Sequence, residues 1–246
     1  MQHATIAEEI QAAIGAVIER CDFILGRDVA EFEQAFARII GVEHAVGVSN
    51  GLDALRLALF ALEIGPGDEV IVPANTYIAT ALAVSSVSAR PVLVDCDPET
   101  YNLDPQLLAE SITSRTRAII PIHLAGRAVE MEPILAIAGR AGLAVIEDAA
   151  QAHGAEVMGR RCGSIGTVGC FSFYPSKNLG AYGDGGAVTT NDTALAGRLR
   201  LLRDNGQCAK YVHVVQGLNA RLDTLLAAVL RVTVPRVDAW NRSRAR

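Results

Sequence analysis

Short apolar runs alternate with helix-like segments along most of this chain, and that alternation restricts its fold more than any other feature. Residues 69–72 and 92–95 are two such apolar runs, and residues 79–87 between them have a helical pattern. This arrangement is typical of βαβ units, so it predicts an α/β protein with a largely parallel sheet and helices packed against it. The length of 246 residues fits one large domain better than two full ones.

Similar patterns predict the other elements. In residues 29–40 apolar side chains recur on one helical face, and Gly41 follows as a stop signal. Further strands are predicted at 44–48, 118–122, 143–146, 168–173 and 186–190. Further helices are predicted at 52–62, 131–141, 193–203 and 220–231. Residues 240–246 have the pattern of the middle of an amphipathic helix without a stop signal, so we expect a chain that is cut short.

Composition excludes several classes of protein. Half of the residues are hydrophobic, which excludes a disordered chain. The net charge of −5 gives no basic surface for a nucleic acid, and no apolar run approaches the roughly 18 residues of a membrane span. The N-terminal residues have neither the basic start nor the apolar stretch of a signal peptide. The five cysteines form no CxxC pair and the five histidines have no ligand spacing, so we expect a cytoplasmic protein without a metal site.

Lysine is rare in this chain. Of the 22 basic residues, 20 are arginine, and only Lys177 and Lys210 are lysine. Arginine stays protonated, whereas lysine can lose its proton and act as an amine nucleophile. Each lysine is therefore a candidate for chemistry that arginine cannot perform, and the alternative is that two lysines remain by chance.

A first candidate site lies at residues 49–55, SNGLDAL, which lead from a predicted strand through a turn of small residues into a helix. The free N–H groups and the positive dipole end at such a helix start can bind a phosphate. Many turns between a strand and a helix have this composition and bind nothing, so both interpretations stay open.

A second candidate site lies at residues 143–148, LAVIED, an apolar strand that ends in Glu147 and Asp148. Ligands in open α/β sheets bind at the carboxyl ends of strands. Because side chains alternate along a strand, the two carboxylates should face opposite sides, so that one faces a ligand and the other serves the structure. The alternative is that one of them only caps the following helix.

A third candidate site is the loop that carries Lys177. Residues 171–186 leave a predicted strand, pass through a turn that contains Pro175, and return to a strand through a Gly-rich stretch. A lysine in a loop is normally solvated, but apolar and aromatic neighbours can desolvate its amine and make it reactive. Together the three segments supply a helix start that can bind a phosphate, an acid that can pair with a pyridine nitrogen and a lysine that can react with an aldehyde. These are the groups that hold pyridoxal phosphate in a protein.

The segments VIEDAAQAHGA (145–155), FSFYPSKNLGAYGDGGAVTTND (171–192) and KYVHVVQGLNARLD (210–223) resemble the DegT/StrS family of sugar aminotransferases. The resemblance covers essentially the whole chain. It implies the aspartate-aminotransferase fold (fold type I), with a three-layer large domain whose mostly parallel sheet has helices on both faces. It also implies that 1–246 is the pyridoxal-phosphate-binding large domain, with an N-terminal helical segment 1–40 and a truncated C-terminal helix 220–246, and that the family's C-terminal small domain is absent.

The resemblance also assigns roles to single residues. Lys177 is similar to the family's catalytic Schiff-base lysine, and Asp148 to the catalytic partner of the pyridine nitrogen. Gln151 stands where the family contacts the ring hydroxyl. The family's relative that dehydrates sugars has histidine in place of the lysine, so Lys177 favours transamination.

Other residues resemble the family's cofactor-binding positions. Ser172 resembles its phosphate-binding serine, and the backbone of Gly51 and Leu52 resembles its phosphate seat at a helix start. Tyr77 stands where an aromatic side chain usually stacks on the ring. Asn219 resembles the residue that reaches the phosphate of the neighbouring subunit, which implies a homodimer with shared active sites.

The implied reaction is the transfer of an amino group from an amino acid, expected to be glutamate, to a keto group of a nucleotide-linked deoxysugar. Lys177 would move the proton between substrate and cofactor as general base and acid. Many members have a hydroxyl residue where this chain has Leu52, and a subset with leucine acts mostly on 3-keto sugar nucleotides. Gln151 also favours a 3-keto group, but the nucleotide, the sugar and the position of its ketone stay open.

Two alternative classes of protein share some of these features. A short-chain dehydrogenase has a similar length, but this chain has no GxGxxG after its first strand, and Pro175 separates Tyr174 from Lys177, which a helix interior would not tolerate. The second alternative is a truncated chain that folds and binds the cofactor but does not turn over.

Overall fold

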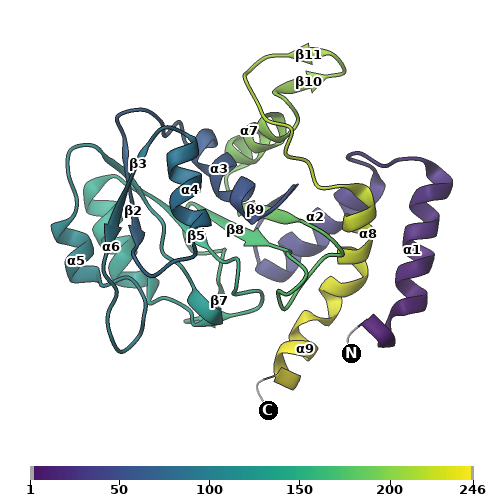
Figure 1. Cartoon of the computed structure of the whole chain (residues 1–246), viewed down its shortest axis with the longest axis horizontal. Coiled ribbons are helices and arrows are strands. Elements are labelled where there is room, and N and C mark those ends of the chain that lie inside the picture. Colours follow the sequence, from purple (N-terminus) through teal and green to yellow (C-terminus); the bar gives the residue numbers. More distant parts are fainter. Residues whose placement is uncertain (1–2, 245–246) are drawn as a thin grey trace.

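The computed structural model describes residues 3–244, which contain a mixed sheet of seven strands with the order β1-β9-β8-β5-β4-β2-β3 (Figure 1). The strands are β1 (His44–Val48), β2 (Glu69–Pro73), β3 (Arg90–Val94), β4 (Thr116–Ile119), β5 (Ala144–Asp148), β8 (Val168–Ser172) and β9 (Gly186–Thr190). Only β9 pairs antiparallel with its neighbours in this sheet, β1 and β8, and the other pairs are parallel. The prediction of a mostly parallel sheet is therefore confirmed.

Helices of ordinary length connect most of these strands. They are α1 (Ala7–Arg20), α2 (Arg27–Ile40), α3 (Gly51–Ala61), α4 (Ala79–Ser86), α5 (Pro105–Glu110), α6 (Met131–Ala141), α7 (Thr193–Arg203), α8 (Thr224–Thr233) and α9 (Val237–Arg244). Short 3-10 turns are η1 (His3–Thr5), η2 (Leu124–Gly126) and η3 (Val234–Arg236). Two small hairpins are β6 (Glu156–Val157) with β7 (Arg160–Arg161), and β10 (Gln207–Ala209) with β11 (Val212–His213).

The sheet is covered on both faces because its buried strands direct alternate side chains to opposite sides. Val70 and Val72 of β2 belong to a core cluster with residues of α3, α4 and α7. Ile71, between them, belongs to a cluster with residues of α5 and α6 on the opposite face. Farther along that face, α2 and α8 cover β1, β8 and β9. The predicted three layers are therefore present.

Helix α1 lies against α8 at one end of the molecule, and the β10–β11 hairpin projects away from the sheet (Figure 1). Ile10 packs with Val229, and Val17 packs with Ala228. Among the described residues, no helix combines the length and the apolar character that crossing a bilayer requires.

The prediction of a single helix at 220–246 is wrong in its boundaries, because the structure has two helices, α8 and α9, in this region. Arg221 and Asp223 form isolated bridges with Val48 and Ile24, so the backbone before α8 is extended. Pro235 then follows the last turn of α8, and because proline has no N–H to donate, the chain passes through η3 before α9 begins.

Candidate active site

The carboxyl ends of β5 and β8, the start of α3 and the loop after β2 meet around a cavity of about 600 Å³. This volume lies within the range of small-molecule and cofactor sites. The structure brings all but one of the residues that the sequence singled out to this cavity: Gly51, Leu52, Tyr77, Asp148, Gln151, Ser172 and Lys177. A ligand site at the carboxyl edge of an open α/β sheet is the placement that this topology favours.

Asp148 provides the cavity with a buried carboxylate, 7% exposed, at the last position of β5. Its Oδ1 accepts a hydrogen bond from Ala150 N–H at 3.1 Å, and its Oδ2 accepts one from Thr80 Oγ1 at 2.9 Å. Burial raises the pKa of the Asp148 carboxyl, and the two hydrogen bonds oppose that rise because they favour the ionised form. A cationic or N–H group of a ligand would stabilise this carboxylate further.

Glu147 faces the other side of the sheet. Its carboxylate is completely buried and accepts hydrogen bonds from the N–H groups of Gly163, Ile165 and Gly166 at 2.6–2.7 Å. His123 Nε2 lies 3.0 Å from Glu147 Oε2, and His123 Nδ1 accepts a hydrogen bond from Val129 N–H. Because Nδ1 is an acceptor, Nε2 carries the hydrogen and donates it to Glu147. Glu147 thus anchors the loop 163–166, as the alternation of the strand predicted for one of the two acids.

Lys177 lies in a tight turn after β8, where its N–H donates to the carbonyl of Tyr174 at 2.9 Å. Its side chain lines the cavity, and no described residue forms a hydrogen bond or an ion pair with its Nζ. Lys210, by contrast, lies in the β10–β11 hairpin, with its Nζ 5.3 Å from the centre of the Tyr211 ring. The structure therefore distinguishes the two lysines that composition alone left equivalent.

The start of α3 presents free donors to the same cavity. Asn50 caps the helix, and its side-chain oxygen accepts a hydrogen bond from Asp53 N–H at 2.8 Å. The N–H groups of Gly51 and Leu52 have no acceptor among the described residues. Gly51 also lies tightly against Ser172, because a Cβ atom at position 51 would be 2.6 Å from Ser172 Cβ. A phosphate at this helix start would meet two N–H groups and the Ser172 hydroxyl.

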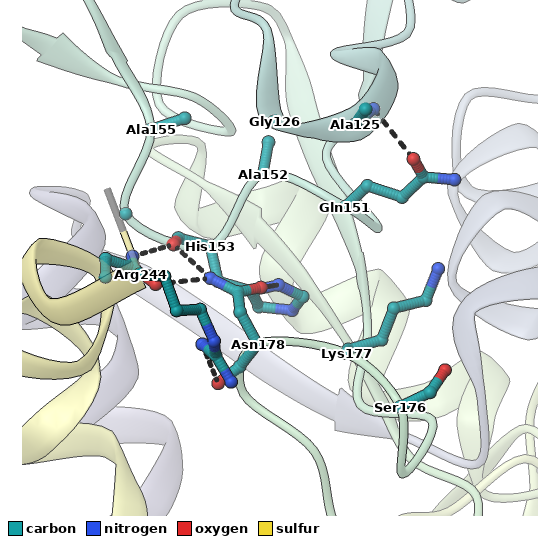
Figure 2. A pocket seen from close by; sticks show the side chains of 12 residues that line it. Ala125, Gly126, Gln151, Ala152, His153, Ala155, Ser176, Lys177, Asn178 and Arg244 are labelled. Carbon is teal, nitrogen blue, oxygen red and sulfur yellow. Dashed lines mark hydrogen bonds between the residues drawn. The ribbon is translucent and has the colours of Figure 1, made fainter. Parts of the chain in front are cut away.

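Gln151 and Tyr77 complete the cavity. Gln151 Oε1 accepts a hydrogen bond from Ala125 N–H at 2.7 Å, and Figure 2 shows its amide nitrogen turned away from Ala125. That nitrogen can therefore donate to a ligand oxygen. Tyr77 is 72% exposed at the rim, which leaves its ring free to lie against a planar ligand.

A second hollow of about 650 Å³ shares Gln151, Ser176 and Lys177 with the first cavity, and Figure 2 shows its lining residues. Next to it, Asn178 Nδ2 donates to the carbonyl of His153 at 2.8 Å and to Asn241 Oδ1 at 2.9 Å. His153 Nδ1 lies 2.8 Å from Asn178 Oδ1 and must donate, because an amide oxygen only accepts. Burial lowers the pKa of His153 to about 4, so the ring is neutral at pH 7. These bonds tie the residue after Lys177 to α9, and no sequence motif had indicated them.

Asn219 does not line the cavity of its own chain. It is exposed, and its backbone forms an isolated bridge with Asp204 near the β10–β11 hairpin. The predicted role of Asn219 concerns a neighbouring subunit, and that role stays a prediction. Within the described residues, no group of three or more histidine, cysteine, aspartate or glutamate side chains is arranged to hold a metal ion.

An open α/β sheet with a lysine, a buried aspartate and a free helix start at its carboxyl edge defines a cofactor-binding domain of the aminotransferase type. Residues 4–246 match the model of the DegT/DnrJ/EryC1/StrS aminotransferase family, and the chain belongs to that family. The resemblance identified from the sequence motifs is thus confirmed.

Individual relatives are closely similar. A dTDP-3-amino-3,4,6-trideoxy-alpha-D-glucose transaminase of Streptomyces venezuelae is 51% identical over 237 residues, which are 96% of this chain and 62% of that protein. A UDP-2-acetamido-2-deoxy-3-oxo-D-glucuronate aminotransferase of Pseudomonas aeruginosa is 50% identical over 93% of this chain and 64% of that protein.

Solved structures confirm the fold type I architecture. The X-ray structure of S. venezuelae DesV in complex with a ketimine intermediate matches with a TM-score of 0.97 and 50% identity, and covers 99% of this chain and 66% of that one. The chain therefore spans between 62% and 66% of the length of these relatives.

Proposed function

We propose that this chain binds pyridoxal 5'-phosphate and serves the transfer of an amino group from an amino acid to a keto sugar linked to a nucleotide. One observation carries the proposal: an amine with no hydrogen bond or ion pair to any described residue, a buried carboxylate and a free helix start line a single cavity. When bound, pyridoxal phosphate supplies an aldehyde that links to amines and a protonated ring that withdraws electrons from the reacting carbon.

The residues of the cavity fit that group. The N–H groups of Gly51 and Leu52 and the Ser172 hydroxyl bind the phosphate at the start of α3. Asp148 accepts the N–H of the pyridine ring and holds its proton, since the carboxylate is buried and has few other partners.

Three side chains orient the ring and move protons. Gln151 Nε2 donates to the ring hydroxyl, and Tyr77 lies against the ring face and excludes water from it. The Lys177 amine would hold the cofactor and, once released from it, would move a proton between the substrate carbon and the cofactor carbon as general base and acid.

Glutamate is the proposed amino donor, and a keto group at C3 of a nucleotide-linked sugar is the proposed acceptor. The names of the two relatives described above support the position, since both refer to a 3-amino or 3-oxo sugar. They differ in the nucleotide, dTDP in one and UDP in the other, so the proposal covers nucleoside-diphosphate sugars as a class.

The assay that tests this function mixes the purified protein with pyridoxal phosphate, glutamate and a nucleotide-linked 3-keto sugar. Mass spectrometry should detect the amino sugar together with 2-oxoglutarate. The corresponding 4-keto sugar is the matched control. Amination of the 4-keto sugar alone would overturn the proposed position, and the absence of product with either sugar would overturn the proposed reaction.

A homodimer with shared sites is part of this proposal. Asn219 is exposed outside its own cavity, and the nearby hairpin exposes Tyr211 (81%) and Val212 (50%), a surface that fits a second copy of this chain. Mixing Lys177→Arg chains with Asn219→Ala chains gives heterodimers in which one of the two sites keeps both residues. Cofactor binding should return in that mixture alone. If mixing restores nothing although the protein is dimeric, Asn219 does not serve the partner's site.

The proposed compartment is the cytoplasm. All five cysteines are free, in agreement with a reducing environment.

A further inference from the structure

Thr80 is a residue that the sequence did not single out, and it contacts the carboxylate of Asp148. It is the second residue of α4, it is 1% exposed, and its hydroxyl lies 2.9 Å from Asp148 Oδ2. Helix α4 lies on the same face of the sheet as Asp148, so the fold brings these two residues together across 68 positions of sequence.

The hydroxyl of Thr80 is also connected to a second hydroxyl. Thr76 Oγ1 lies 2.8 Å from Thr80 Oγ1, and its other possible acceptor, the carbonyl of Tyr77, is at 3.3 Å. A hydroxyl has one hydrogen, and a carboxylate can only accept. Thr80 therefore donates to Asp148, and Thr76 donates to Thr80 through the shorter of its two contacts. The order Thr76, Thr80, Asp148 defines a directed chain of hydrogen bonds.

We propose that Thr80 is a positioning residue for Asp148: its hydroxyl keeps the carboxylate ionised and in one orientation at the edge of the cofactor cavity. The proposal rests on the proposed function, because Asp148 is the group that would meet the pyridine ring. Thr80 itself touches no reacting atom.

Few groups stabilise the charge of Asp148. Ala150 N–H and the Thr80 hydroxyl are the only hydrogen-bond donors to its carboxylate among the described residues. His123 and Lys177 act on this carboxylate electrostatically, without a hydrogen bond to it. Glu147 precedes Asp148 on β5, and the thiol of Cys170 lies beside it on β8. A hydrogen bond to a buried charge is worth more than one between neutral groups, so the loss of one of two donors should be measurable.

A titration of the cofactor-free chain tests the first part of the proposal. Aspartate labelled with ¹³C at the carboxyl carbon reports each carboxyl by NMR, and Asp148→Asn identifies the resonance of Asp148. In Thr80→Val the carboxyl pKa of Asp148 should rise by about one unit or more, the scale of one hydrogen bond to a charge. Thr80→Ser, which restores the hydroxyl, should return it to the wild-type value.

Matched controls separate this effect from a general loss of structure. Thr233→Val removes another buried hydroxyl, on α8, which donates only to Leu230 of its own helix, and it should leave the Asp148 titration unchanged. If Thr80→Val does not fold, Thr80→Ala removes the same donor with less steric change. A titration of Asp148 that is indistinguishable from wild type in a folded variant without the hydroxyl would overturn the proposal.

Cofactor binding tests the second part. Pyridoxal phosphate should bind Thr80→Val about tenfold more weakly than wild type, and Thr80→Ser should bind it normally. Equal affinity of wild type and Thr80→Val would overturn the role of Thr80 toward the cofactor. If wild type itself does not bind pyridoxal phosphate, the proposed function fails, while the NMR titration still decides whether Thr80 controls Asp148.

Discussion

Glu147 and Asp148 are consecutive residues at the end of β5, yet their carboxylates lie on opposite faces of the sheet and have different partners. Glu147 binds three backbone N–H groups and His123 in the interior, whereas Asp148 lines the cavity and binds Ala150 and Thr80. The two neighbouring carboxylates therefore have separate surroundings, and substitutions should separate the structural role of Glu147 from the role proposed for Asp148.

Glu147→Gln should destabilise the fold. The new amide would direct hydrogens at N–H donors and leave buried donors unpaired, which costs about 1–3 kcal/mol for each unsatisfied group. Urea unfolding followed by circular dichroism measures this loss. Glu63→Gln, in the exposed pair with Arg198, is the control and should change stability by less than about 1 kcal/mol. Equal midpoints for the two variants would contradict the structural role of Glu147.

Asp148→Asn should instead impair the chemistry. The amide has nearly the same size but cannot hold a proton on the ring nitrogen, so the half-reaction with glutamate should slow by about 10²- to 10³-fold. Stopped-flow absorbance on the holoenzyme measures the rate. A loss of less than about tenfold would reject the assignment of Asp148.

Gly51→Ala should weaken cofactor binding while leaving the fold intact. The added Cβ would lie 2.6 Å from Ser172 Cβ, so either Ser172 or the start of α3 must move away from the proposed phosphate position. We expect the dissociation constant for pyridoxal phosphate to increase by at least about tenfold, measured by fluorescence titration. Gly197→Ala is the control, because a Cβ there meets no atom within 4 Å. Unchanged affinity in Gly51→Ala would exclude a phosphate at this helix start.

His153 should make stability dependent on pH between about 6.5 and 4. Its pKa is lowered by burial from 6.5 to about 4, so in this window the unfolded chain binds a proton that the folded chain does not. The contribution of His153 is therefore complete above pH 6.5 and decreases by about 3 kcal/mol as the pH falls to 4. His153→Gln keeps a donor for Asn178. In this variant the midpoint of urea unfolding should change less with pH over this window. Parallel profiles for the variant and the wild type would contradict the buried neutral histidine.

The residues that line the cavity could be located from the sequence because they follow strands or begin helices, and the local pattern of strand, turn and helix determines where those positions lie. Asp148, Ser172 and Gly51 are of this kind. Their roles toward a cofactor stay predictions. Thr80 carries no such signal, because a threonine early in a helix is ordinary and only the packing of α4 near the end of β5 brings it to Asp148. His123 and Asn178 were also missed, since their partners lie 24 and 25 residues away.

The boundaries of the last helix were wrong for a related reason. Residues 220–223 have no local feature that prevents a helix, and their extended backbone depends on bridges with β1 and with Ile24, which are distant in sequence. Pairing between remote segments overrides local helix propensity in such cases. The hairpins β6–β7 and β10–β11 are too short to give a periodic pattern, and they were not predicted.

The covalent attachment site of pyridoxal phosphate tests the central claim most directly. The purified chain is incubated with the cofactor, reduced with borohydride, digested and mapped by mass spectrometry. Lys177 lines the cavity, and its amine has no hydrogen bond or ion pair to any described residue, so we expect a phosphopyridoxyl group on Lys177, its loss in Lys177→Arg, and its retention in Lys210→Arg. A label on Lys210, or a label that persists in Lys177→Arg, would contradict it.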